Sequence, residues 1–117
     1  MIKKEKIKVI KFYKGNIIKF FDFKKYIKKC DEIYFSEVKK KYFKGWKFHK
    51  DKKQVMTIAA GSVEFYFKNK INSKPKKLKL SYPNKLYLLH IPEKVFYCFK
   101  CVSNQKAMIV NLVSKTK

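Results

Sequence analysis

The chain has 117 residues, of which 46% are hydrophobic and 17% aromatic, and this length fits one domain over residues 1–117 with one core. That apolar content excludes general disorder, in spite of a formal net charge of +23. No apolar run is long enough to span a membrane, and the residues after Met1 do not form the apolar stretch of a secretory signal, so we expect a cytoplasmic protein.

The positive charge comes from lysine alone, since all 31 basic residues are lysine and only 8 residues are acidic. Lysine, isoleucine, asparagine, phenylalanine and tyrosine have A/T-rich codons, so the composition indicates a gene from an A/T-rich genome. Proteins selected to bind phosphate usually keep some arginine, because the guanidinium group forms two parallel hydrogen bonds. We therefore expect no specific nucleic-acid partner, and only weak binding of nucleic acid at low salt.

Alternation with a period of two residues runs through most of the chain and predicts strands. Turn signals such as Lys14-Gly15-Asn16, Ala60-Gly61-Ser62 and Tyr82-Pro83-Asn84 separate these runs. One weak helix is predicted over residues 22–29. Short strands at this spacing favour an all-β sandwich or barrel. In chain order, the predicted strands are 7–12, 43–49, 63–68, 77–82, and then 86–91 and 107–113, which are apolar on both faces and indicate buried strands or an oligomer contact.

The chain has three cysteines, Cys30, Cys98 and Cys101. A small and odd number of cysteines argues against a disulfide framework. Cys98 and Cys101 have the spacing of metal ligands or of a redox pair, but no second pair completes a zinc site. A spacing of three also places the two thiols on opposite faces of a strand. We interpret them as ordinary strand cysteines with free thiols.

Side chains that could take part in catalysis are concentrated around His49 in the sequence. If 43–49 is a strand, Lys47 and His49 project to one face, and Trp46 and Phe48 to the other. A histidine takes and returns protons near neutral pH, and a lysine beside it can hold oxyanion charge. The alternative is that His49 is a structural histidine and Lys47 a solvated charge. We expect Trp46 to lie in the core and the second histidine, His90, to be structural.

Four segments resemble a known family, the cupins related to dTDP-4-dehydrorhamnose 3,5-epimerase. The resemblance covers roughly residues 32–114 and depends on the order and spacing of the segments. They are Glu32-Ile33-Tyr34-Phe35-Ser36-Glu37-Val38, then Lys44-Gly45-Trp46-Lys47-Phe48-His49-Lys50 followed by Gln54, then Gly61-Ser62-Val63, and Leu89-His90-Ile91-Pro92-Glu93-Lys94-Val95-Phe96-Tyr97-Cys98-Phe99.

The resemblance implies an all-β, antiparallel jelly-roll sandwich that forms a homodimer. It implies action on a nucleotide-linked 4-keto-6-deoxy sugar, such as a dTDP sugar, in the biosynthesis of surface polysaccharide or lipopolysaccharide. In the epimerases a histidine removes the proton next to the ketone, and Lys47 stands at its position; Gln54 stands where a lysine stabilises the enolate. The related 3,4-ketoisomerases use a His-x-His pair followed by a glutamine, which His49 and Gln54 match in part.

From the residues and the resemblance together we expect His49 to act as the base and Lys47 as the cation for the enolate oxygen. Lys44 would bind a phosphate, and Gln54, Tyr97 and Tyr34 would line the substrate pocket. Either epimerase-like or ketoisomerase-like chemistry would follow from this arrangement.

Metal-binding cupins use a His-x-His pair with a glutamate and a later histidine. Here His49 stands for only one member of the pair, and Glu64 and His90 have no partners at ligand spacing, so we expect neither a metal nor another cofactor. Two alternatives stay open. One is a non-catalytic cupin that binds a sugar nucleotide, and the other is a basic β-barrel that stacks bases on its aromatic side chains.

Overall fold

The computed structural model describes residues 2–22 and 30–116, and within them it contains eleven strands and no helix. The predicted helix at 22–29 lies almost wholly outside the described residues. The strands are β1 (Lys3–Lys6), β2 (Lys8–Ile10), β3 (Ile17–Lys19), β4 (Glu32–Val38), β5 (Phe43–Phe48), β6 (Lys52–Ala60), β7 (Ser62–Lys68), β8 (Lys76–Ser81), β9 (Tyr87–Ile91), β10 (Phe96–Cys101) and β11 (Ala107–Lys115).

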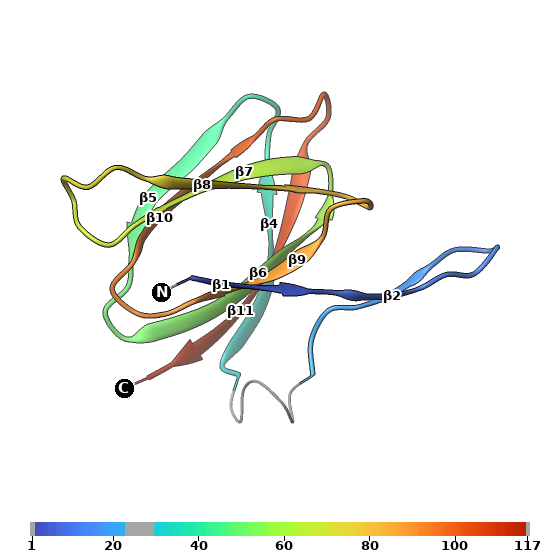
Figure 1. The fold of residues 1–117 in the computed structure, drawn as a ribbon, viewed down its shortest axis with the longest axis horizontal. Helices are drawn as coiled ribbons and strands as arrows, with labels where there is room; N and C mark the ends of the chain where they lie inside the picture. Colours follow the sequence, from blue (N-terminus) through green and yellow to red (C-terminus); the bar gives the residue numbers. More distant parts are fainter. Residues whose placement is uncertain (1, 23–29, 117) are drawn as a thin grey trace.

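The strands form two packed sheets and a small hairpin, as Figure 1 shows. One sheet has the order β1-β9-β6-β11-β4, the other has the order β5-β10-β7-β8, and β2 and β3 form a two-stranded hairpin that projects from the side of the sandwich. All paired neighbours run antiparallel. This architecture confirms the predicted all-β antiparallel sandwich.

The main core lies between the two sheets and follows from the alternation in the sequence. On β7, Val63, Phe65 and Phe67 are buried while the residues between them are partly exposed. Phe65 packs edge-on against Phe99 of β10, with 5.8 Å between the ring centroids. Full burial of a side chain of this size stabilises a fold by about 1.5–3 kcal/mol, so this row is a principal source of stability.

Strands β9 and β11 are apolar on both faces because both faces are covered. Their inward side chains, such as Leu89 and Ile109, belong to the main core. Their outward side chains, such as Leu88 and Val110, form a second cluster with Phe20, Phe21 and Cys30. A contact with another subunit is therefore not needed to explain the hydrophobic outer faces of these two strands.

Two further expectations can be compared with the fold. The strand predicted over 7–12 is wrong in its extent, because β1 pairs with β9 in the large sheet while β2 ends at Ile10 and starts the separate hairpin. All three cysteines are free, as predicted. Cys101 belongs to the core between the sheets, whereas Cys98, three residues earlier, lies outside that cluster.

Candidate functional site

Strand β5 carries the site, and an irregularity in its pairing with β10 decides where its side chains lie. Lys47 is opposite Tyr97, but Gly45 is opposite Cys98, so Trp46 is an extra residue in β5. Such a bulge shifts the alternation of a strand by one residue. As a result Lys44 and Lys47, although three residues apart, both turn toward the edge of the large sheet: Lys44 Nζ donates to Ser36 Oγ of β4 at 2.9 Å.

His49, Tyr97 and Gln54 form a hydrogen-bonded row. Gln54 Nε2 donates to Tyr97 Oη over 3.2 Å, and Tyr97 Oη lies 3.3 Å from His49 Nε2. Gln54 and Tyr97 are only 3% and 2% exposed, so their positions are determined by the core. His49 is partly exposed and directly follows β5. Its backbone carbonyl accepts a hydrogen bond from Lys94 N at 2.7 Å. A rigid buried pair thus orients an accessible imidazole.

A cavity of about 10 Å³, which we call the inner cavity, lies between the sheets beside this row. Asn111 of β11 is 1% exposed and donates through Nδ2 to Tyr34 Oη at 2.7 Å, while its Oδ1 has no hydrogen-bond partner among the described residues. A buried carbonyl oxygen without a donor is costly, so this atom marks a place for a polar group. The inner cavity is lined by Tyr34, Ser36, Lys47, Met56, Tyr97, Phe99, Ile109 and Asn111.

A larger hollow of about 560 Å³, the β4–β5 groove, opens at the edge of the sandwich next to the inner cavity. Tyr34 and Ser36 line both hollows, and Lys44 lines the groove. The volume is in the range of small-molecule sites, whereas the inner cavity holds about one water molecule. The hydrogen bond from Lys44 to Ser36 lies at the boundary between them. The groove is lined by Tyr34, Phe35, Ser36, Glu37, Lys39, Tyr42, Phe43 and Lys44.

The electrostatics of the site favour a neutral imidazole next to an ammonium group. Partial burial lowers the pKa of His49 below its ordinary value, and the charges of Lys52 and Lys47 lower it further. Burial also lowers the pKa of Lys47, and the charge of Lys44 adds to this effect. Burial raises the pKa of Tyr97 to about 12, against the effect of the hydrogen bond from Gln54, so this phenol stays neutral. At neutral pH the imidazole of His49 is therefore neutral and able to accept a proton.

The structure brings all six residues predicted for the site to one edge of the sandwich. His49, Gln54 and Tyr97 are joined directly, Lys47 and Tyr34 line the inner cavity, and Lys44 lines the groove. Asn111 and Ser36 also belong to the site, although the sequence did not predict them as site residues. Asn111 is the one amide within the otherwise apolar run 107–113, and that interruption was the available signal.

The prediction for Trp46 is wrong, while that for His90 agrees with the structure. Trp46 is 45% exposed, with Lys68 Nζ 4.4 Å above its ring, because the bulge places it on the outer face of the small sheet. His90 Nε2 lies 2.9 Å from Glu5 Oε1 on the neighbouring strand β1. This contact is separate from the row of His49, Tyr97 and Gln54.

Neither a metal site nor a membrane segment is seen in the part of the chain that the structure describes. No three side chains of histidine, cysteine, aspartate or glutamate are grouped there as metal ligands would be. Among the same residues, no helix has the length and apolar character needed to cross a membrane.

The lowered pKa of His49 makes a prediction about stability. A histidine with a folded-state pKa below its unfolded value of about 6.5 binds fewer protons when folded, so the protein loses stability as pH falls from about 6.5 through the folded-state pKa. We expect His49→Gln to reduce the loss of unfolding free energy between about pH 7.5 and about pH 5. Urea unfolding at both pH values measures this; equal losses in the two proteins would contradict it.

The architecture is an antiparallel, cupin-like β-sandwich, a fold shared with solved epimerases and isomerases of dTDP sugars. No protein-family model matches the chain. No curated protein matches it in sequence.

The solved structures give the particular likeness. A dTDP-sugar isomerase from Desulfovibrio desulfuricans G20 superposes with a TM-score of 0.87 at 23% identity, over 96% of this chain and 75% of that one. A dTDP-6-deoxy-D-glucose-3,5-epimerase from Legionella pneumophila, in complex with dTDP-4-keto-L-rhamnose, gives 0.84 at 18%, over 99% and 68%. The sugar 3,4-ketoisomerase QdtA from Thermoanaerobacterium thermosaccharolyticum, in complex with TDP, gives 0.78 at 22%, over 97% and 80%. At these identities the likeness confirms the resemblance in fold and does not establish an activity.

Proposed function

We propose that this protein is a sugar-nucleotide isomerase or epimerase that acts on a nucleotide-linked 4-keto-6-deoxy sugar by removing a proton next to the ketone. The observation that carries the proposal is the neutral His49, held by the buried pair Tyr97 and Gln54, with Lys47 two residues earlier in β5. Proton abstraction of this kind needs a base with a pKa near the working pH and a cation for the developing enolate oxygen. The likeness to enzymes of dTDP sugars supports the substrate class.

In the proposed reaction His49 takes the proton from the carbon beside the carbonyl, and the bonding electrons move to the carbonyl oxygen. The ammonium of Lys47 stabilises the resulting enolate. In the ketoisomerase-like reaction the hydroxyl proton at C3 passes to the C4 oxygen, and the protonated His49 returns its proton to C4, which leaves the ketone at C3. Asn111 Oδ1, which lacks a donor among the described residues, would accept a hydrogen bond from a sugar hydroxyl. Lys44 would leave Ser36 to bind a phosphate in the β4–β5 groove, and Tyr34 would line the path between groove and cavity.

The choice between the two reactions depends on the number of proton-transfer groups. Among the described residues that form the site, His49 is the one imidazole, its pKa is lowered, and Tyr97 stays protonated. Moving a proton between adjacent carbons needs one base, whereas inverting a centre needs a donor on the other face of the sugar. We therefore favour the 3,4-ketoisomerase-like reaction. A cytoplasmic role in the biosynthesis of surface polysaccharide or lipopolysaccharide is part of the same proposal.

The proposal is tested by incubating the protein with dTDP-4-keto-6-deoxyglucose in deuterated water and following deuterium at C3, C4 and C5 by NMR. Deuterium at C4 of a 3-keto product and at C3 of recovered substrate, with none at C5, is expected and supports the ketoisomerase-like reaction. Exchange at C3 and C5 with the ketone still at C4 would assign the epimerase reaction instead. If the protein binds this and related 4-keto sugars but exchanges no deuterium into them, the proposal that it is an enzyme is contradicted.

That last outcome would leave a non-catalytic sugar-nucleotide binder, the second candidate. Two observations favour it. The inner cavity has a volume of about 10 Å³, which is far too small for a sugar ring unless side chains move. Lys47 also stands where the epimerases resembled by this chain carry their histidine.

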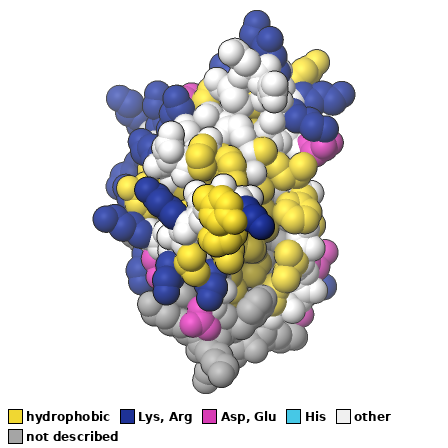
Figure 2. All heavy atoms as spheres, turned by 90° about the vertical axis from the view of Figure 1, so that its right-hand side faces the viewer, with side chains coloured by type: hydrophobic (Ala, Val, Ile, Leu, Met, Phe, Trp, Pro, Cys, Tyr) yellow, Lys and Arg dark blue, Asp and Glu magenta, His cyan; other side chains and the backbone are white. Residues whose placement is uncertain are grey.

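A homodimer is the proposed assembly, and exposed hydrophobic side chains support it. Figure 2 looks onto the side from which the β2–β3 hairpin projects, and hydrophobic side chains gather at its centre between lysines. Exposed apolar residues of the hairpin include Phe12 and Ile17, each 54% exposed, and the edge strand β4 exposes Ile33 and Phe35. An exposed apolar patch such as the one in Figure 2 marks an interaction surface.

Light scattering at high micromolar concentration is expected to give twice the chain mass, because a twofold contact covers the same patch on both subunits. Phe12→Ser with Ile17→Ser is expected to shift the protein toward the monomer. The matched control, Ile71→Ser, replaces an apolar residue that is 68% exposed on the β7–β8 hairpin and should leave the mass unchanged. A wild-type monomer would contradict the prediction.

The lysine surplus is expected to give only weak binding of nucleic acid. If the charge reflects genome composition, binding of any DNA sequence should be similar and should be largely lost near physiological salt, because it depends on counterion release. Fluorescence anisotropy with two unrelated single strands over a salt series measures this. Tight and sequence-selective binding at physiological salt would instead favour the basic β-barrel interpretation.

A further inference from the structure

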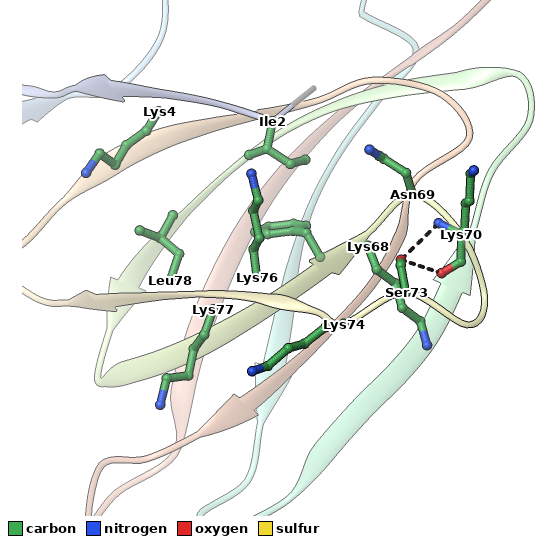
Figure 3. Close-up of a pocket in the computed structure, with 11 residues that line it drawn as sticks. Ile2, Lys4, Lys68, Asn69, Lys70, Ser73, Lys74, Lys76, Lys77 and Leu78 are labelled. Carbon is green, nitrogen blue, oxygen red and sulfur yellow. Dashed lines mark hydrogen bonds between the residues drawn. The ribbon is translucent and has the colours of Figure 1, made fainter.

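A second hollow lies at the edge of the sandwich that is opposite the β4–β5 groove. In the strand order, β4 and β5 form one pair of sheet edges, and β1 and β8 form the other. A pocket of about 540 Å³ opens between β1, β8 and the β7–β8 turn; we call it the β1–β8 pocket (Figure 3). It shares no lining residue with the candidate site.

The β1–β8 pocket joins an apolar floor to a cationic rim. Its floor contains Ile2, Phe67 and Leu78, and Phe67 is 6% exposed as part of the main core. Six of its eleven described lining residues are lysines, and none is acidic. The rest of the lining is Asn69 and Ser73, and the lysines are Lys4, Lys68, Lys70, Lys74, Lys76 and Lys77.

Three of these lysines already have partners outside the pocket: Lys4 Nζ lies 4.5 Å above the ring of Tyr87, and the other two are Lys77 and Lys68. Lys77 Nζ lies 3.5 Å from Glu64 Oε2, and Lys68 Nζ donates to the carbonyl of Ile71 at 2.9 Å. For Lys70, Lys74 and Lys76, the structure gives no carboxylate partner among the described residues. These ammonium groups surround one hollow, so they repel one another electrostatically. A bound anion would reduce this repulsion.

Two lysines stand at positions where the alternation of the strands calls for apolar residues. Lys76 has the same parity as Leu78 and the fully buried Leu80 of β8. Lys4 is paired with the fully buried Leu89 and follows Ile2 by two residues. Figure 3 shows Ile2 pointing toward Lys76 across the pocket. The A/T-rich composition favours isoleucine and phenylalanine as much as lysine, so it does not explain charges at core-facing positions.

The turn that closes one end of the pocket is held in place by hydrogen bonds. Ser73 Oγ donates to the carbonyl of Lys70 at 2.7 Å and accepts from Lys70 N at 3.3 Å, as the dashed lines in Figure 3 mark. The backbone that carries Lys70 and Lys74 is therefore ordered before any ligand arrives, which reduces the entropy cost of binding.

We propose that the β1–β8 pocket binds an organic phosphate whose body is aromatic or otherwise apolar. The apolar body would lie on Ile2, Phe67 and Leu78, and the phosphate would bind the ammonium groups of Lys70, Lys74 and Lys76. The volume is in the range of sites for small organic ligands. This site is additional to the proposed sugar-nucleotide site and does not depend on it.

The test uses 4-methylumbelliferyl phosphate as the probe and compares it with its two parts, 4-methylumbelliferone and inorganic phosphate. Titration of the ¹⁵N-labelled full chain is followed by NMR. The phosphate ester is expected to shift the amides of Asn69, Ser73 and Leu78, and to bind about tenfold or more tightly than either part. Lys74→Glu with Lys76→Glu is expected to weaken this binding by about tenfold or more.

The matched control is Lys8→Glu with Lys19→Glu, which makes the same change in net charge at two exposed, paired positions of the β2–β3 hairpin. It should leave the affinity within about twofold, because exposed charges at a distance are screened. Inward lysines on edge strands also prevent sheets from pairing edge to edge, and that role alone would give no binding. No binding, equal affinity for inorganic phosphate, or equal effects of the two double variants would overturn the proposal.

Discussion

His49→Asn is expected to slow deuterium entry into a 4-keto sugar substrate by about 10²–10⁴-fold, the usual effect of losing a general base. The variant should fold and bind the substrate, because Asn is smaller and polar and the buried pair of Tyr97 and Gln54 keeps its own hydrogen bond. The measurement is NMR-detected exchange at C3 and C5 of dTDP-4-keto-6-deoxyglucose, with substrate affinity measured separately.

The chain offers a matched control in its other histidine. His90 pairs with Glu5 on the large sheet, apart from the row around His49, so His90→Asn should change the exchange rate little. Lys47→Met should lower the rate and weaken binding, because it removes a positive charge that faces an anionic ligand. If His49→Asn exchanges deuterium as fast as the wild type, His49 is not the base.

Gly45→Ala is expected to give the largest loss of stability of any glycine substitution in the described residues. Gly45 has φ of +123°, and a Cβ there would lie 2.5 Å from Cys98 Cβ and 2.8 Å from Cys98 Cα. The unfavourable φ costs about 1–3 kcal/mol. The collision with the β10 backbone adds about 1–3 kcal/mol, since the adjacent strand must move. Urea unfolding monitored by circular dichroism measures the sum.

Gly15→Ala separates the two contributions. Gly15 has φ of +136°, but no atom lies within 4 Å of the place where its Cβ would be. It therefore bears the conformational cost without the collision, and Gly45→Ala should lose more stability by the steric part alone. Because Gly45 lies between Lys44 and Lys47, its variant should also lose exchange activity. Equal destabilisation by the two substitutions would contradict this, because it would show that β10 can shift to make room for the Cβ without a loss of stability.

Much of the architecture was readable from local patterns. Alternation over 63–68 predicted β7, and apolar runs over 86–91 and 107–113 predicted β9 and β11. These predictions hold because successive side chains on a strand face opposite sides of the sheet. Burial of one side therefore produces hydrophobic residues at every second position. The same logic predicted that His49 and Lys47 share a face; in the structure Lys47 belongs to β5 and His49 follows the end of that strand.

The types of the residues and their resemblance to known motifs predicted which residues belong to the site. They did not predict the contacts between those residues. Gln54 and Tyr97 are 43 residues apart, and only the packing of β6 against β10 brings the amide to the phenol. Asn111 looked like part of a strand interior, and it became a candidate ligand-binding residue only when its carbonyl oxygen was found buried without a donor among the described residues.

The sequence by itself therefore determined the class of fold, the strands of the core and the identity of the candidate base. The tertiary structure decided which side chains share a surface. Strict alternation places Lys44 and Lys47 on opposite faces and Trp46 in the interior, but β5 pairs with β10 through a one-residue bulge at Trp46. That bulge turns both lysines toward β4 and leaves Trp46 45% exposed. A bulge depends on the partner strand, here on Cys98 packing against Gly45, and a partner distant in the sequence leaves no local pattern.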